Sequence, residues 1–247
     1  MLVLSHPPHG AVDPKLAAPL LDLAPVDVRL KANYPVPEIW LAPASPDQAA
    51  DAAAALRAAG FRIVLVPGAA LARIPGPNPV ESFALEDGRL ILRAREECVV
   101  GYGRPVIGVL FSPRPSGGRG LPPPAFLDLY AVCDRRLERW TFLQGTTGFA
   151  GFEGQSASFG TNVRTLADDL RRRFARFTLD ERLLNMQVRR RVGTPPPGVM
   201  RRGYSYATAS LNKLLESLSP GLSQLEHDDL ASRLAFLTWA AGDAPAA

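Results

Sequence analysis

The chain of 247 residues lacks most of the short motifs that identify enzymes. It contains no Gly-x-Ser-x-Gly nucleophile elbow and no glycine-rich run that ends in Gly-Lys-Ser/Thr, as a phosphate-binding P-loop does. Only three histidines are present. A hydrolytic triad needs a nucleophile, a base and a group that orients the base. These absences favour a non-catalytic protein without excluding an enzyme, and they identify no catalytic residue.

Metal-binding patterns are also scarce. The two cysteines, Cys98 and Cys133, form no Cys-x-x-Cys pair. Both lie in apolar runs, which is typical of buried free thiols, and a disulfide between them is the open alternative. His6 and His9 are spaced like two ligands, but no third ligand is near, and structural zinc sites take four. We therefore predict no metal and no other cofactor.

Long apolar runs and targeting signals are missing as well. No stretch approaches the roughly 18 consecutive apolar residues of a membrane-spanning helix. The first residues, MLVLSHPPHG, have no charged segment and too short an apolar run for a secretory signal. Enrichment in Ala, Arg and Pro is typical of GC-rich bacterial genomes. We expect a cytoplasmic bacterial protein.

The clearest pattern that is present is a strand-helix-strand unit over residues 36–67. Ser45, Pro46 and Gln48 are typical of a helix N-terminus, and Gly60 stands where a helix-ending glycine belongs. Small residues recur between them at helical spacing and form a narrow face that can pack closely on a sheet. This face consists of Ala49, Ala52, Ala53, Leu56 and Ala59.

Alternating apolar segments then predict an antiparallel sheet. The expected strands cover 80–85, 89–93, 97–102, 106–111, 126–133 and 137–143, with Asp87-Gly88 as a hairpin turn. Val26, Val28 and Leu30 also alternate, as an edge strand would. The predicted fold class is α+β: a strand-helix-strand unit plus an antiparallel sheet, followed by a helical C-terminal region.

Two segments resemble known structural families. Residues 36–67 are similar to small ferredoxin-like regulatory modules in their strand-helix-strand pattern. Residues 83–111 resemble the start of pleckstrin-homology-like sheets, in which two strands joined by a turn precede a tyrosine and an apolar stretch, here Tyr102 and Val106-Ile107. Pro105 departs from that pattern. These resemblances concern the fold and imply no particular activity.

We predict four regions along the chain. They are a proline-rich N-terminal arm at 1–35, an α/β sheet domain at 36–160, a helical region at 161–240 and a tail at 241–247. Pro, Gly and Ser dominate residues 112–124, which we interpret as a flexible loop of the sheet domain or, alternatively, an interdomain linker. Apolar spacing predicts helices over 162–177, 178–188 and 206–218, and a last helix that begins at Ser223.

Residues 145–160 form the most unusual loop, with five glycines and three phenylalanines. One interpretation is a backbone nest for a phosphate or another small anion just before a helix N-terminus. The other is a loop that its phenylalanines anchor to the core. The possible anion-binding residues are Gly145, Gly148, Gly151, Gly154 and Gly160.

Positive charge gathers in one part of the chain. Residues 113–202 carry a net charge of +8, whereas 1–112 carry −1 and 203–247 carry −3, which together give +4. Arginine suits bidentate contacts with phosphate or carboxylate. We predict a partner-binding surface made of Arg171, Arg172, Arg173, Arg176, Arg189, Arg190, Arg191, Arg201 and Arg202.

The leading hypothesis is therefore a non-catalytic accessory, scaffold or regulatory subunit that binds another macromolecule through these arginines. Nucleic-acid binding is the first alternative, although no helix-turn-helix, zinc, KH or RNP motif accompanies the charge. An arginine-rich helix face in contact with solvent is the simplest explanation. An enzyme or small-anion sensor that uses the glycine-rich loop is the second alternative. The sequence predicts neither the partner's identity nor the oligomeric state.

Overall fold

The computed structural model describes residues 2–6, 12–33, 37–41, 43, 45–111, 126–133, 135–184 and 224–241. The chain forms two compact units. Unit 1 comprises Met1–Leu71 and Val188–Ala247, and unit 2 comprises Ala72–Gln187. Both helices and strands are present, so the predicted α+β class is confirmed. The predicted divisions at residues 35 and 160 do not coincide with the limits of these units.

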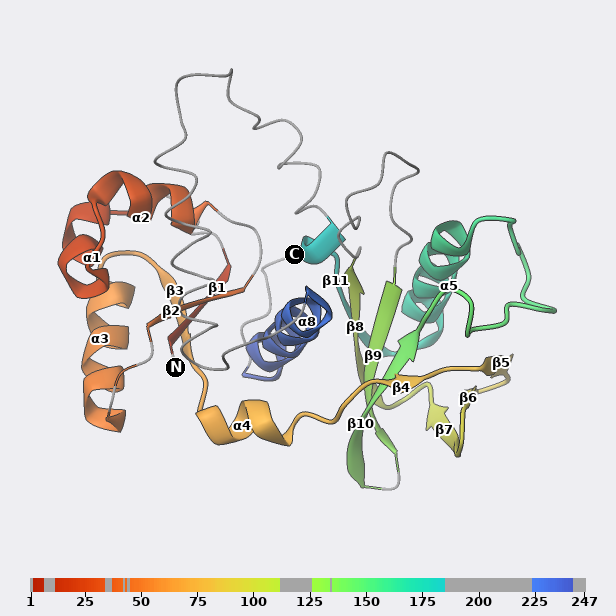
Figure 1. The fold of residues 1–247 in the computed structure, drawn as a ribbon. Coiled ribbons are helices and arrows are strands. Elements are labelled where there is room, and N and C mark those ends of the chain that lie inside the picture. Colours follow the sequence, from red (N-terminus) through yellow and green to blue (C-terminus); the bar gives the residue numbers. More distant parts are fainter. Residues whose placement is uncertain are drawn as a thin grey trace, which may run out of the picture. The chain divides into compact units, whose positions relative to one another are not determined.

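Unit 1 is built on a three-stranded sheet with the order β2-β1-β3, shown in Figure 1. Strand β1 is antiparallel to both neighbours, so the strands of the predicted strand-helix-strand unit flank it. The elements are β1 (Leu2–His6), α1 (Pro14–Leu21), α2 (Pro25–Ala32), β2 (Glu38–Leu41), α3 (Pro46–Ala58), β3 (Arg62–Leu65), α4 (Gly68–Arg73) and α8 (Gln224–Ala240). The segment 1–35, predicted as an arm, thus supplies the central strand and two helices.

Local sequence explains helix α3 as predicted. The Ser45 side chain accepts a hydrogen bond from the Gln48 backbone N–H at 3.2 Å, Pro46 starts the helix, and Gly60 follows its end at a φ of 91°. The predicted small-residue face packs into the core of unit 1 with Trp40, Phe61 and others. The last helix is also confirmed, since α8 begins at Gln224 and its Leu234 packs with Ile39 and Val66.

The edge strand predicted for Val26, Val28 and Leu30 is wrong, because these residues lie in helix α2. Pro25 starts the helix, and Arg29 and Lys31 in its last turn complement the helix dipole. Val28 and Ala32, four residues apart, are buried, whereas Val26 and Leu30 are exposed. The alternating residues therefore lie on opposite faces of a helix, since positions two apart are separated by about 200° around its axis.

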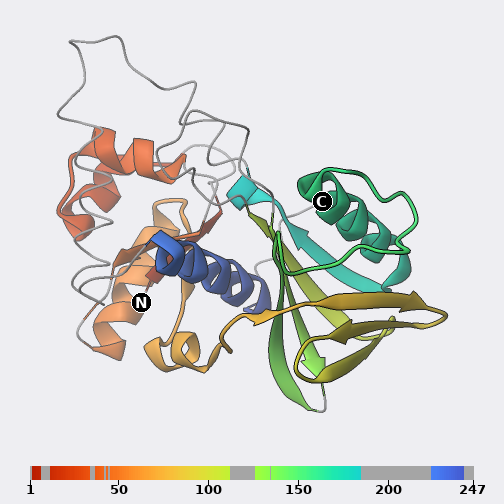
Figure 2. The same ribbon diagram turned by 45° about the vertical axis from the view of Figure 1, so that its right-hand side comes forward.

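Unit 2 contains two sheets and one long helix, as Figure 2 shows. One sheet has the order β11-β8-β9-β10-β4 and the other the order β5-β6-β7. The elements are β4 (Asn78–Pro79), β5 (Ser82–Glu86), β6 (Arg89–Arg93), β7 (Glu97–Gly101), β8 (Pro105–Phe111), β9 (Phe126–Cys133), β10 (Arg136–Phe142), α5 (Phe159–Arg173) and β11 (Arg176–Asp180). The core joins apolar residues of both sheets and of α5, including Leu92, Trp140 and Leu166.

The predicted strands of this region are present, and Gly88 takes a φ of 80° in the Asp87-Gly88 turn that joins β5 to β6. They divide into two sheets rather than extending one. Only the pairs of β8 with β9 and of β9 with β10 are antiparallel in the larger sheet. Its two edge strands, β11 and β4, run parallel to their neighbours.

The helices predicted for 162–177 and 178–188 need correction, because residues 176–180 form strand β11. Phe177 and Leu179 alternate with polar residues, and they lie over Gly108 of β8. A Cβ atom at Gly108 would lie 2.9 Å from Phe177 Cζ and 3.1 Å from Leu179 Cδ1. Glycine therefore makes room for the side chains of β11, and the parallel pairing overrides the helical pattern.

Cys98 and Cys133 form a disulfide, so the prediction of free thiols is wrong. The bond joins β7 of the smaller sheet to the end of β9 in the larger one. Both side chains are buried, and the Cα atoms are 6.1 Å apart. Apolar neighbours in sequence are typical of a buried disulfide as well as of a buried thiol, so the sequence alone does not distinguish the two.

The predicted helix at 206–218 and the segment 112–124 lie outside the described residues. The same holds for residues 185–188 of the helix predicted for 178–188, of which residues 182–184 are helical.

We expect reduction of the disulfide in metal-free buffer to lower the free energy of unfolding of unit 2 by about 3–4 kcal/mol. This follows from the loop-closure entropy of a cross-link across a sequence separation of 35 residues. Urea unfolding of the oxidised and reduced chain measures it. The Cys98→Ala/Cys133→Ala double variant is the control and should not respond to reductant; equal stability of the two wild-type states would contradict the prediction.

Candidate interaction surface

Helix α5 presents the first four predicted arginines at or just beyond its C-terminal end. Ser158 caps its start, accepting from the Thr161 N–H at 3.3 Å, and the buried Val163, Leu166 and Leu170 fix which face turns inward. Arg171, Arg172 and Arg173 consequently lie in the last turn, all exposed, where cations stabilise the helix dipole.

One carboxylate forms ion pairs with two of these arginines. Asp169 binds Arg172 at 3.2 Å and Arg173 at 2.9 Å, and its hydrogen bond raises the pKa of the Arg173 guanidinium. The Arg172 side chain keeps 69% of its surface exposed and Arg173 keeps 37%. Because Asp169 offsets a single charge, the helix end stays positive.

Tyr102 fixes the end of α5 against the turn between β7 and β8. Its ring packs edge-to-face on Phe174 at 4.9 Å, and its carbonyl accepts from the Ala175 N–H at 2.9 Å. Burial raises the pKa of the Tyr102 hydroxyl, and the neighbouring Arg173 opposes that shift. The basic helix end is thus attached to a rigid sheet rather than to a free segment.

Strand pairing adds a further arginine to this surface. Arg176, the first residue of β11, pairs with Pro105, so the exposed Arg104 in the preceding turn lies beside it. Arg104 lies more than 50 residues before the start of α5 at Phe159 and carries no local signal, and the sequence prediction omitted it. We define the basic surface as Arg104, Arg171, Arg172, Arg173 and Arg176.

The other predicted partner-binding residues, Arg189, Arg190, Arg191, Arg201 and Arg202, lie outside the described residues. The proposal below therefore rests on the basic surface alone.

The glycine-rich loop packs against the core of unit 2. Phe149 is buried, and its ring lies edge-to-face with Phe83, Phe152 and Phe159 at 5.3–5.8 Å between centroids. The Ser156 backbone of the loop is bound by the side chain of Asn162 in α5, which accepts from the Ser156 N–H at 2.6 Å and donates to the Ser156 carbonyl at 2.9 Å. These contacts favour the structural interpretation of the loop.

The glycines of the loop take several conformations. Gly145, Gly151 and Gly154 have φ of 79–83°, which glycine adopts readily, and Gly148 donates to the Glu81 carbonyl at 2.8 Å. Gly160 lies in the first turn of α5. Anion binding by these residues stays a prediction.

A buried charged network that the sequence did not reveal crosses β9 and β10. Arg139 binds Asp128 at 2.7 Å, and Thr141 donates to the same carboxylate at 2.5 Å. The Arg139 guanidinium also lies over the Tyr130 ring, 5.7 Å from its centroid. The strand register brings these four side chains together, since Asp128 faces Thr141 and Tyr130 faces Arg139 across β9 and β10.

Unit 1 carries an exposed apolar surface on its first two helices. Leu16, Leu20, Val26 and Leu30 keep 38–61% of their surface exposed. Beside them, a cavity of about 490 Å³ is lined by Val12, Asp13, Pro14, Lys15, Pro25, Val26 and Arg29. Asp13 accepts from the Lys15 backbone N–H at 2.9 Å as the cap of α1. Apolar side chains gathered in this way are typical of a protein contact.

Comparison with models of protein families, with curated proteins and with solved structures finds no match for this chain. Among the helices of the described ranges, none has the length and apolar character needed to span a membrane.

We expect Arg139→Met to destabilise unit 2 by about 3–5 kcal/mol, because it leaves the Asp128 carboxylate buried without this cation. The Asp128→Asn/Arg139→Met double variant removes both charges and should lose less than the two single variants together. Urea unfolding of all three measures the coupling.

Arg172→Gln is the matched control for this cycle, since it breaks an exposed ion pair and should cost less than about 1 kcal/mol. Equal losses for Arg139→Met and Arg172→Gln would show that the buried pair contributes no more than a surface pair.

Proposed function

We propose that this protein is a non-catalytic accessory, scaffold or regulatory subunit that binds an acidic macromolecular partner through the basic surface of unit 2. The observation that supports it is the convergence of arginines from separate elements. Arg104 comes from the turn before β8, Arg171 from the end of α5, and Arg176 from the start of β11.

The helix dipole accounts for Arg171–Arg173 without any partner, but it does not account for Arg104 and Arg176, which lie outside the helix. Arg104, Arg171 and Arg176 form no ion pair with another described residue. Like charges that lie close together repel one another. An anionic group that binds such a surface relieves the repulsion and therefore stabilises it. Carboxylates and phosphates suit the planar guanidinium best.

An acidic protein fits better than a nucleic acid as the partner, because no helix-turn-helix, zinc, KH or RNP motif accompanies the arginines in the sequence. Nucleic-acid binding through the same arginines is the alternative. It predicts affinity that falls steeply with salt and little preference for sequence.

A cytoplasmic bacterial location belongs to the same proposal. The disulfide is evidence against the cytoplasmic part of this proposal, because structural disulfides persist mainly in oxidising compartments. Fractionation of the native host, with the thiols blocked at lysis, measures both the location and the redox state of the cysteine pair.

We expect the variant Arg104→Gln/Arg171→Gln/Arg176→Gln to recover at least about tenfold less partner than the wild type. Each exposed charge contact contributes up to about 1 kcal/mol, and 1.4 kcal/mol is a factor of ten. The measurement is capture from nuclease-treated host lysate at physiological salt, with quantitative mass spectrometry of what the wild type enriches.

Arg89→Gln/Arg93→Gln/Arg95→Gln is the matched control, because it removes three exposed arginines from the β6 region of the same unit and changes the net charge equally. It should retain the partner. Equal recovery with both triple variants would contradict the proposal, and a wild-type ligand that disappears on nuclease treatment would favour the nucleic-acid alternative.

A further inference from the structure

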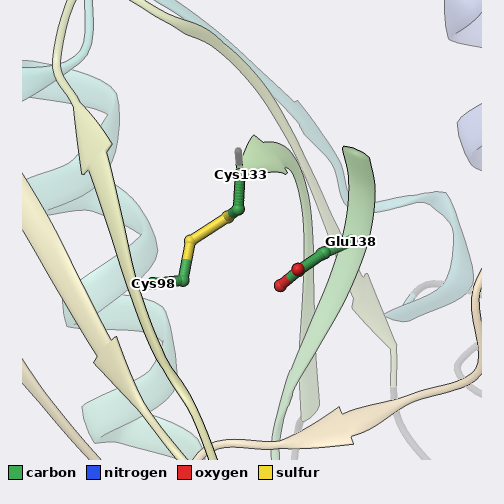
Figure 3. Close-up of side chains that lie close together, drawn as sticks. All are labelled: Cys98, Cys133 and Glu138. Carbon is green, nitrogen blue, oxygen red and sulfur yellow. A yellow bond between two sulfur atoms is a disulfide. The ribbon is translucent and has the colours of Figure 1, made fainter. Parts of the chain in front are cut away.

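The disulfide of unit 2 has a carboxylate beside it. Cys98 comes from β7, Cys133 from the end of β9 and Glu138 from β10. Cys133 pairs with Arg136, so Glu138 is its diagonal neighbour, two residues further along β10 on the same face of the sheet. The two sulfurs and a carboxylate oxygen of Glu138 lie within 4.8 Å of one another. Figure 3 shows the Glu138 side chain reaching toward the disulfide.

Reduction changes the chemistry of this cluster. A dithiol supplies two electrons and two protons and becomes a disulfide. A phosphine supplies two electrons and becomes the phosphine oxide, while water supplies that oxygen and the two protons. Either reductant cleaves the S–S bond and leaves two thiols. Both cysteines are buried and Glu138 is half-buried. A divalent cation that binds the two sulfurs displaces both thiol protons, and it neutralises two of the three negative charges that the thiolates and the carboxylate then carry.

We propose that the reduced form of this cluster binds one Zn²⁺ through Cys98, Cys133 and Glu138. Zinc takes thiolate and carboxylate ligands together, and three protein ligands leave its fourth position for water. Zn–S distances of about 2.3 Å place two sulfurs about 3.8 Å apart in a tetrahedral site. Rotation of the cysteine side chains can supply that separation while the Cα atoms stay near 6.1 Å.

The metal would preserve a structural connection that reduction breaks. The disulfide joins the two sheets of unit 2, and a reducing compartment would open it. Zinc between Cys98 on one sheet and Cys133 and Glu138 on the other restores the cross-link. The cluster therefore joins the same strands in either redox environment, and this inference does not depend on the proposed partner.

The test uses the full chain, reduced with a phosphine, equilibrated with Zn²⁺ and freed of excess metal. We expect about one zinc per reduced wild-type chain by atomic emission and none per oxidised chain. Co²⁺ in place of Zn²⁺ should give the visible absorption of a tetrahedral thiolate site. Zn²⁺ should also raise the melting temperature of the reduced chain.

Glu138→Gln distinguishes a specific site from adventitious thiol binding, because it retains both cysteines and the ability to form the disulfide. We expect its zinc affinity to fall at least about tenfold, since even residues that only orient metal ligands contribute that much. Glu153→Gln, an exposed glutamate outside the cluster, is the matched control and should bind as the wild type does.

Three results would overturn the proposal. The first is a reduced wild type that binds no more zinc than Cys98→Ser/Cys133→Ser. The second is equal affinity of Glu138→Gln and the wild type. The third is a reduced chain whose melting temperature does not rise at saturating Zn²⁺, since a site that joins the two sheets must stabilise them.

Discussion

The parallel pairing of β11 with β8 is the contact on which the rest of unit 2 depends. Gly108 fits this pairing closely, because a Cβ atom there would lie 2.9 Å from Phe177 Cζ and 3.1 Å from Leu179 Cδ1. The pairing turns the chain back along the sheet directly after α5, which fixes the helix end against the turn at Tyr102. It also places Arg176 beside Arg104. The pairing of β11 with β8 therefore helps to determine where positive charge accumulates on the surface.

Three further connections hold the elements around that surface together. The Cys98–Cys133 bond joins the two sheets, and the phenylalanines of the glycine-rich loop fill the space between Phe83 and α5. The buried Asp128–Arg139 pair ties β9 to β10 at the centre of the larger sheet. Burying these charges costs free energy of desolvation, but a buried charged pair with hydrogen-bonded partners fixes the relative position of the two strands. A sheet fixed in this way can hold surface residues in place.

Local signals in the sequence predicted the local structure well. The caps of α3, the turn at Asp87-Gly88, six strands of unit 2 and helix α8 follow from residue type and spacing. Signals that depend on distant partners were missed. The alternation of Val26, Val28 and Leu30 is as compatible with a helix as with a strand. The apolar residues of β11 have helical spacing, but they pack over Gly108 of β8, about 70 residues earlier in the chain. For the same reason the sequence prediction includes Arg171–Arg173 and Arg176 but not Arg104, and it does not decide whether Cys98 and Cys133 pair.

The central claim is that the basic surface contacts a macromolecule, and a photo-crosslinking residue placed at Gly103 tests it most directly. Gly103 adjoins Arg104, and a Cβ atom added there meets no atom within 4 Å, so the probe should leave the fold intact. Gly76 in the same unit is equally open and serves as the control position. Irradiation in the native host should give a discrete adduct from position 103 that is absent from position 76. The same adducts from both positions, or none from position 103, would contradict the account.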